Sequence, residues 1–100
     1  MGYKVILSIS ARTDLRDIVR YISLDNPEAA LRFGKSLISR TRLLEQSPQL
    51  ERIAPELDDP SIREIIVRSC RVVYRVRHSE QVVEVIRFWP AARDVPDVNV

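Results

Sequence analysis

Cysteine is almost absent from this chain of 100 residues, and glycine and histidine are also scarce. The single Cys70 excludes an intrachain disulfide and a zinc site built on several thiolates. No apolar run approaches the ~20 residues that a membrane-spanning helix needs. Polar residues interrupt the short apolar run at the start, and no small-residue cleavage site follows it, so we expect no signal peptide. These absences predict a cytoplasmic protein that holds no metal or cofactor and binds no membrane.

Neither sign of charge is in large excess, because the formal net charge is only +2. That balance alone does not indicate a nucleic-acid binder. The distribution is uneven, since from Pro60 to Arg93 seven arginines stand against three glutamates, while the preceding residues 51–59 are acidic. A hydrophobic share of 45% and a charged share of 30% are typical of one globular domain over residues 1–100. The charge asymmetry can steer an acidic ligand to one face.

The chain begins with a pattern typical of a strand followed by a helix. Residues 3–9 alternate so that one face is apolar and buried. Ser10 is placed to cap the helix, and Asp14 and Asp17 follow near its positive end. Apolar residues then recur at helical spacing and predict a stripe that faces the core. The stripe consists of Ala11, Leu15, Ile18 and Ile22.

A second, longer helix is predicted to start at Asn26 and Pro27, a capping residue followed by proline in the first turn. Its buried stripe consists of Ala30, Phe33, Leu37 and Leu44. Pro48 is expected to end it. Because only a few residues around Leu24 join the two helices, we expect them to form an antiparallel hairpin.

Three further strands are predicted at residues 63–67, 71–77 and 82–88, after a polar loop at residues 49–61. Short turns between these strands predict an antiparallel meander. The tail at residues 90–100 is expected to be irregular. The element order is β-α-α-β-β-β, which predicts an α+β fold with a helical hairpin packed on one face of a small, mostly antiparallel sheet.

Alternation along the strands predicts which way the arginines point. In residues 71–77 the even positions are apolar and must face the helices, because a row of unpaired buried arginines would cost too much. The odd positions then lie on an open face. Strict alternation in the last strand puts Val82, Ile86 and Phe88 on one face and Val83, Val85 and Trp89 on the other.

An apolar patch rimmed by arginine is a common composition for a protein-binding surface. The open sheet face is therefore the first candidate for function. Its candidate residues for binding a partner are Arg63, Arg71, Arg75, Arg87 and Trp89. Two simpler interpretations stay open: the arginines could be solvated charge that keeps the strands soluble, and Trp89 could belong to the core.

Several segments together resemble the RelE/ParE superfamily, toxins of bacterial type II toxin–antitoxin systems of the plasmid stabilisation type. The likeness runs from Tyr3 to about Asp94. Its segments are ARTDLRDIVRYISLDNPEAALRF (residues 11–33), PEL (55–57), REIIVRSCRVVYRV (63–76) and FWPAARD (88–94). The resemblance implies the same β-α-α-β-β-β layout. It also implies a cytoplasmic toxin that a cognate antitoxin holds inactive in a hetero-oligomer. The adjacent reading frame is expected to encode this antitoxin.

The superfamily divides by mechanism. RelE-like members cut mRNA in the ribosome, whereas ParE-like members poison DNA gyrase and are not nucleases. The cutting reaction needs a base for the ribose hydroxyl, a cation for the phosphorane and an acid for the leaving oxygen. If the chain is an endoribonuclease, the resemblance implies Arg71 and Arg93 as phosphate ligands and Glu56 as the base.

The chain departs from the nuclease pattern at several positions. Glu64 and Ile66 stand where some nucleases have lysine, and Pro90 stands where a histidine often occurs. The only histidine, His78, is predicted in a turn beyond the far end of a strand. A general acid is therefore hard to name. The sequence favours a ParE-like toxin that binds DNA gyrase, with an mRNA endonuclease and a non-toxic binding module as alternatives.

Overall fold

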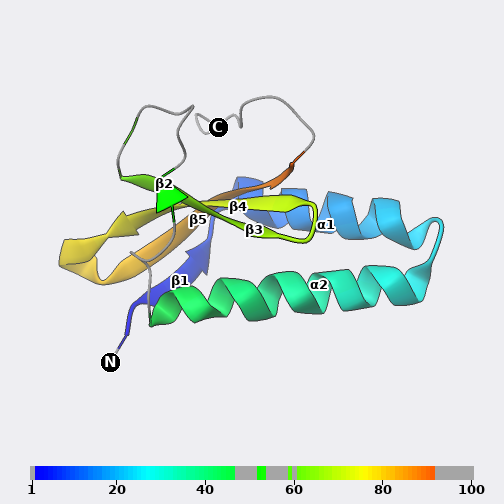
Figure 1. Ribbon diagram of the computed structural model, residues 1–100, viewed down its shortest axis with the longest axis horizontal. Coiled ribbons are helices and arrows are strands. Elements are labelled where there is room, and N and C mark those ends of the chain that lie inside the picture. Colours follow the sequence, from blue (N-terminus) through cyan, green and yellow to red (C-terminus); the bar gives the residue numbers. More distant parts are fainter. Residues whose placement is uncertain (1, 47–51, 54–58, 60, 92–100) are drawn as a thin grey trace.

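The computed structural model describes residues 2–46, 52–53, 59 and 61–91, and all structural statements concern these residues. The elements in chain order are β1 (Lys4–Leu7), α1 (Ile9–Ser23), α2 (Pro27–Arg42), η1 (Leu43–Glu45), β2 (Arg52–Ile53), β3 (Ile62–Val67), β4 (Cys70–Arg77), η3 (His78–Glu80) and β5 (Val82–Pro90). The strands form a single sheet of order β1-β5-β4-β3-β2. β1 runs parallel to β5, and the other neighbours are antiparallel. Figure 1 shows the two helices as an antiparallel hairpin, which confirms the predicted α+β fold.

Both helices begin at polar side chains that cap the first turn. The predicted Ser10 cap is wrong, because β1 ends at Leu7 and the helix begins two residues earlier than expected. Ser8 is the cap, and its Oγ accepts a hydrogen bond of 3.0 Å from the backbone N–H of Ala11. At α2 the predicted Asn26 cap is confirmed, since its Oδ1 accepts from the backbone of Ala29 at 3.1 Å. In the described part of the chain, neither helix is long and apolar enough to cross a membrane.

The main core lies between the helical hairpin and one face of the sheet. The residues of the predicted helical stripes are buried in this core or packed against it, apart from Ala30, which is buried outside this cluster. The second helix is shorter than predicted, because α2 ends at Arg42 and Leu44 lies in η1. From β4, the core takes the even positions Val72, Tyr74 and Val76, as alternation predicted. Tyr74 and Val72 have no exposed surface. The helices therefore cover this face, and the opposite face of the sheet is called the outer face below.

A β-bulge in β5 breaks the predicted alternation. Val73 pairs with Arg87 while its neighbour Tyr74 pairs with Val85, so Ile86 is an extra residue on β5. The prediction that Phe88 shares a face with Ile86 is therefore wrong. Phe88 joins the main core, whereas Ile86 joins Val73 in a small second cluster on the outer face.

Candidate functional site

The centre of the outer face is buried, which corrects the prediction that this face is open. Val73 and Glu64 have no exposed surface, Trp89 keeps 6% and Arg71 keeps 7%. The sheet brings Arg71 and Trp89 together as cross-strand neighbours on β4 and β5. Arg63 does not join them, because it pairs with the core residue Tyr74 and so lies on the face that carries the helices.

Arg71 is held by a carboxylate from the neighbouring strand. Its Nε donates a hydrogen bond of 2.6 Å to Oε1 of Glu64, and its Nη2 lies 2.5 Å from the same oxygen. A lone charge at such depth would cost several kcal/mol, so each of the two residues makes the burial of the other tolerable. The sequence placed Glu64 only as a departure from the nuclease pattern and did not identify it as the partner of Arg71.

Arg87 is held by a carboxylate from α1. Its Nε and Nη2 donate to the two oxygens of Asp14 at 2.7 and 2.8 Å, a bidentate pair. The backbone N–H of Phe88 donates to the same carboxylate at 3.1 Å. The guanidinium also lies over the ring of Trp89, 4.8 Å from its centroid. Asp14 thus links the two layers. The prediction that it lies near the positive end of its helix is wrong, because the first turn of α1 contains no acidic residue.

The arginines farther along β4 are more exposed. Arg75 keeps 36% of its side-chain surface and lies 3.7 Å from Asp59. Hydrogen bonds from Ser61 are the main reason that the pKa of Asp59 lies below its ordinary value, and Arg75 adds to the effect. Arg77 donates to Glu84 at 2.7 Å. The outer face therefore offers accessible guanidinium groups at this end of the sheet, each beside a carboxylate.

The predicted catalytic set is not assembled around Arg71 by the described residues. Glu56 and Arg93 lie outside them. His78 follows the end of β4 opposite to Arg71, and its Nδ1 is 2.8 Å from the hydroxyl of Tyr3. Burial raises the pKa of Cys70 to about 11, so this thiol stays protonated. Within residues 2–46, 52–53, 59 and 61–91, no group of three or more His, Cys, Asp or Glu side chains could hold a metal ion.

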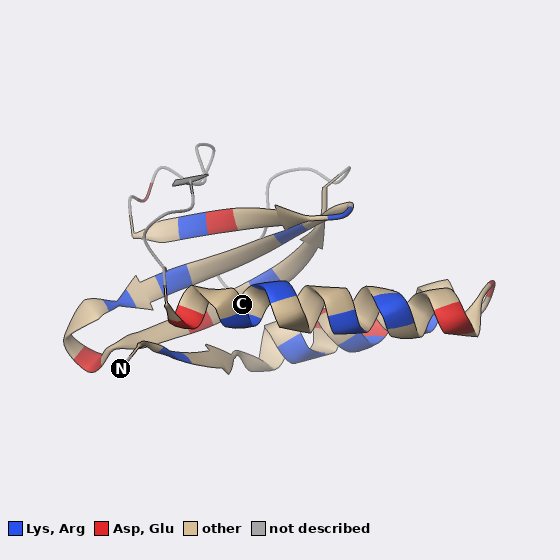
Figure 2. Cartoon of the chain, turned by 60° about the horizontal axis from the view of Figure 1, so that its bottom comes forward, with Lys and Arg blue, Asp and Glu red and all other residues tan. Residues whose placement is uncertain are grey.

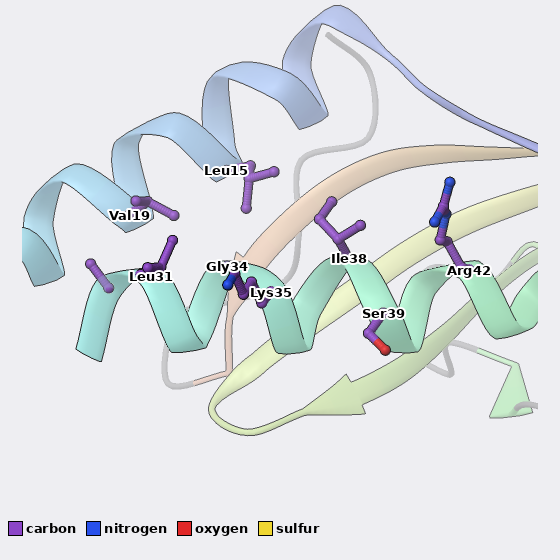
Figure 3. Close-up of a pocket in the computed structure, with 9 residues that line it drawn as sticks. Leu15, Val19, Leu31, Gly34, Lys35, Ile38, Ser39 and Arg42 are labelled. Carbon is purple, nitrogen blue, oxygen red and sulfur yellow. The ribbon is translucent and has the colours of Figure 1, made fainter. Parts of the chain in front are cut away.

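A groove between α1 and α2 was not predicted from the sequence. Its volume is about 650 Å³, and Figure 3 shows Leu15 and Val19 of α1 on one wall and Leu31 and Ile38 of α2 on the other. The full lining of this helical groove is Leu15, Val19, Ala30, Leu31, Gly34, Lys35, Ile38, Ser39 and Arg42. The available signal in the sequence was the presence of apolar residues, such as Leu31, beside the predicted core stripe of the second helix. In the structure Leu31 is 59% exposed although it is large and apolar.

The surroundings of the helical groove are basic. Between Ile9 and Arg42 the chain has seven Lys and Arg residues and four Asp and Glu residues. Figure 2 shows basic residues distributed along both helices. One of the four acidic residues, Asp14, is already paired with Arg87. An apolar groove with basic surroundings suits a partner that is apolar on one side and acidic on its flanks.

Comparison with known proteins places almost the whole chain in one family. A family model described as the ParE toxin of the type II toxin–antitoxin system, parDE, matches residues 5–95. None of the curated proteins compared with the chain matches it.

Several solved structures share the fold. A chromosomal ParDE toxin–antitoxin system from P. aeruginosa is 20% identical with a TM-score of 0.73, and the match covers 89% of this chain and 96% of that one. A mutant of the E. coli toxin RelE in the free state is 22% identical with a TM-score of 0.66, covering 92% and 86%. The toxin–antitoxin complex RelBE2 from Mycobacterium tuberculosis is 20% identical with a TM-score of 0.58, covering 90% and 99%. At these identities the likeness establishes the fold and leaves the target open.

Proposed function

The chain belongs to the ParE toxin family of type II toxin–antitoxin systems, and from this premise we propose that it is a cytoplasmic toxin that binds an essential target protein and does not cut RNA. The target class that we propose is DNA gyrase, which the likeness to ParE toxins implies. A cognate antitoxin would hold the toxin inactive. Two similar structures, from P. aeruginosa and M. tuberculosis, are of a toxin–antitoxin system and a toxin–antitoxin complex, and this supports such a partner.

One observation supports binding over RNA cleavage more than any other: Arg71 is buried and bonded to Glu64. A phosphate ligand must present its guanidinium where a ribose phosphate can reach it. Arg71 is 7% exposed, and the fully buried Glu64 accepts hydrogen bonds from it. A carboxylate at that distance would also repel an incoming phosphate. Arg71, which the nuclease pattern assigns to the phosphate, is therefore bonded to Glu64 inside the protein.

We place the antitoxin in the helical groove. An amphipathic helix can bind such a groove with side chains spaced three and four residues apart. Acidic residues on the flanks of that helix would lie near Lys35 and Arg42, which line the groove. Of the arginines predicted on the sheet for partner contact, Arg75 keeps a partly exposed side chain on the outer face, and we assign it to the target.

Induction of the chain in a bacterium without its antitoxin tests this function. Gyrase poisoning predicts filamentation and a DNA-damage response while translation continues. It also predicts that the purified chain inhibits supercoiling by gyrase. Rapid loss of translation together with cut mRNA would contradict the proposal and support the endonuclease. Unhindered growth would indicate a non-toxic member of the family.

Replacing both members of the buried pair tests the role of Arg71. In Arg71→Met/Glu64→Leu, apolar residues of similar volume replace an ion pair, an exchange that is often neutral or stabilising. We expect this variant to stay folded and toxic. If Arg71 binds the scissile phosphate, the folded variant instead loses cleavage on the order of 10²-fold or more.

Arg71→Ala alone is the control for that experiment. It leaves Glu64 buried without this partner, and we expect the free energy of unfolding to fall by about 3–5 kcal/mol. Loss of toxicity in Arg71→Ala therefore reports on folding. The melting temperatures of both variants, measured by circular dichroism, separate the two causes.

A further inference from the structure

A second hollow lies between α1 and the turn that joins β3 to β4. Its volume is about 560 Å³, within the range of small-ligand sites. Its lining is Asp17, Ile18, Tyr21, Ile22, Phe33, Arg68, Ser69, Cys70 and Pro90. This turn pocket shares no residue with the helical groove. A partner could therefore occupy it while another molecule fills the groove.

The floor of the turn pocket is built from the core, and its rim is open. Phe33 is 9% exposed and Cys70 is 1% exposed, so both are fixed by packing on other sides. On the rim, Tyr21 keeps 77% of its surface exposed, and nearby Leu24 keeps 83%. A rigid apolar floor beside an exposed tyrosine is the usual setting for a side chain that anchors a protein interface.

Arg68 holds a cation at the opposite rim at a cost to the backbone. It is the first of two turn residues between β3 and β4, and its φ is 54°. Glycine adopts this left-handed conformation without penalty, whereas other side chains are disfavoured there. The guanidinium Nη2 lies 3.3 Å from Oγ of Ser36 on α2. Strained positions of this kind are concentrated at functional sites.

The charges around Arg68 favour a carboxylate. Arg68 also lines a smaller hollow, together with Arg40, Ser36 and Ile66. Of the two guanidinium groups, only that of Arg68 also lines the turn pocket. The acidic residue of the turn pocket, Asp17, lies on the α1 wall 3.8 Å from Nε of Arg16. The basic side of the pocket is therefore the side formed by the β3–β4 turn.

We propose that the turn pocket is a docking site for a segment of a partner protein that presents an apolar side chain followed by a carboxylate. The apolar side chain enters between Ile18, Ile22 and Phe33. The carboxylate binds the guanidinium of Arg68 at the rim. A nucleic acid is the poorer fit, because its binding sites need several cations in a row along the backbone, and here the walls are mainly apolar. The proposal does not depend on the identity of the toxin's target or antitoxin.

Two blocked tetrapeptides probe this site directly. Acetyl-Ala-Leu-Glu-Ala-amide and its Gln analogue are titrated into ¹⁵N-labelled protein, and the backbone amide shifts are followed by NMR. We expect saturable shifts at Ile22, Arg68 and Cys70 with a Kd on the order of 1 mM. The Gln peptide should bind about fivefold more weakly, because it lacks the charge that pairs with an exposed guanidinium.

Arg68→Gly is the decisive variant. It removes the cation and relieves the left-handed backbone, so the melting temperature should stay equal or rise while the preference for Glu over Gln disappears. Arg42→Gln is the matched control, because it removes one positive charge from the helical groove and should leave both peptide affinities unchanged.

Four results would overturn the proposal. The two peptides could bind with equal affinity to the unmodified chain, the shifts could map to Leu31 and Ile38 of the helical groove, or Arg68→Gly could melt lower while keeping the Glu preference. A ten-nucleotide RNA that produces the same shifts more strongly than the peptides would also replace a protein partner with a nucleic acid. None of these results bears on gyrase inhibition, so the failure of this proposal and that of the proposed function are distinguishable.

Discussion

At the scale of single residues, Cys70 couples the stability of the fold to pH. The thiol is 1% exposed at the start of β4, and burial raises its pKa from 9.0 to about 11. Because the folded state holds this proton more tightly than the unfolded chain, the stabilisation is complete below about pH 9 and is lost as the pH rises to about 11. We expect this group to lower the free energy of unfolding by about 2–3 kcal/mol across that range.

Urea unfolding at a series of pH values measures this effect, with Cys70→Ala as the reference. The substitution costs a roughly constant amount through the cavity that it leaves. The difference between the two proteins should therefore be flat below pH 9 and should shrink above it. A difference that stays constant up to pH 11 would show that the thiol does not titrate as argued. The titration of lysines and tyrosines cancels in this difference, because both proteins carry the same ones.

The arginine side chains show which features of single residues could not be predicted from the sequence. Their strands were predicted correctly, and so was the buried even face of β4. The partners were not, because they depend on contacts between distant parts of the chain. Asp14 and Arg87 are 73 positions apart, and only the packing of α1 beside β5 brings them to 2.7 Å. Glu64 meets Arg71 only because β3 and β4 pair in one particular register.

At the scale of elements, periodicity predicted the helices, the three-strand meander and their order. It could not predict the bulge at Ile86, since one inserted residue shifts every later side chain of β5 to the other face and leaves the composition unchanged. The two-residue strand β2 was also missed, because it is shorter than any alternation can reveal. The parallel pairing of β1 with β5 is a tertiary choice that no local pattern encodes.

The glycine of α2 supplies a test of the helical groove. Gly34 lies in the middle of the helix, and a Cβ built there would meet Cγ2 of Val19 at 3.5 Å, an ordinary contact. Gly34→Ala should therefore raise the free energy of unfolding by about 0.5–1 kcal/mol through helix propensity. The added methyl also fills part of the groove. We expect antitoxin affinity to fall at least about fivefold, as overpacking costs about 1 kcal/mol or more.

Thr13→Ala is the matched control for Gly34→Ala. Thr13 is exposed on α1, and it does not line the helical groove. The change to alanine again raises helix propensity, but antitoxin affinity should stay the same. Isothermal titration calorimetry with the purified antitoxin gives both affinities. If Gly34→Ala stabilises the toxin and leaves its antitoxin affinity unaltered, the antitoxin docks elsewhere.

At the scale of the whole molecule, two layers are joined at one edge by a polar clamp. β1 pairs with β5 only as far as Leu7 and Val85, and beyond that point α1 takes over the edge. Ser8 donates to the backbone oxygen of Ile86 at 2.9 Å, and Asp14 accepts from the backbone N–H of Phe88. The start of α1 thus satisfies a strand edge that would otherwise be left unpaired.

Removing the Asp14 carboxylate should loosen the contact between the layers. Asp14→Ala deprives Arg87 and the N–H of Phe88 of this acceptor, and we expect the free energy of unfolding to fall by about 2–4 kcal/mol. Asp17→Ala is the control on the same helix. Its side chain is 61% exposed, and its ion pair with Arg16 is long, at 3.8 Å. The free energy of unfolding should therefore change by no more than about 0.5 kcal/mol.

Trp89 reports on that clamp because it is the only tryptophan and lies under the guanidinium of Arg87. In Asp14→Ala its fluorescence should change before the main unfolding transition, whereas far-ultraviolet circular dichroism follows only the main transition. The two signals should coincide in Asp17→Ala. Coincident transitions in both variants, at the stability of the unmodified chain, would mean that core packing alone holds α1 against β5 and that the Asp14 clamp adds nothing measurable.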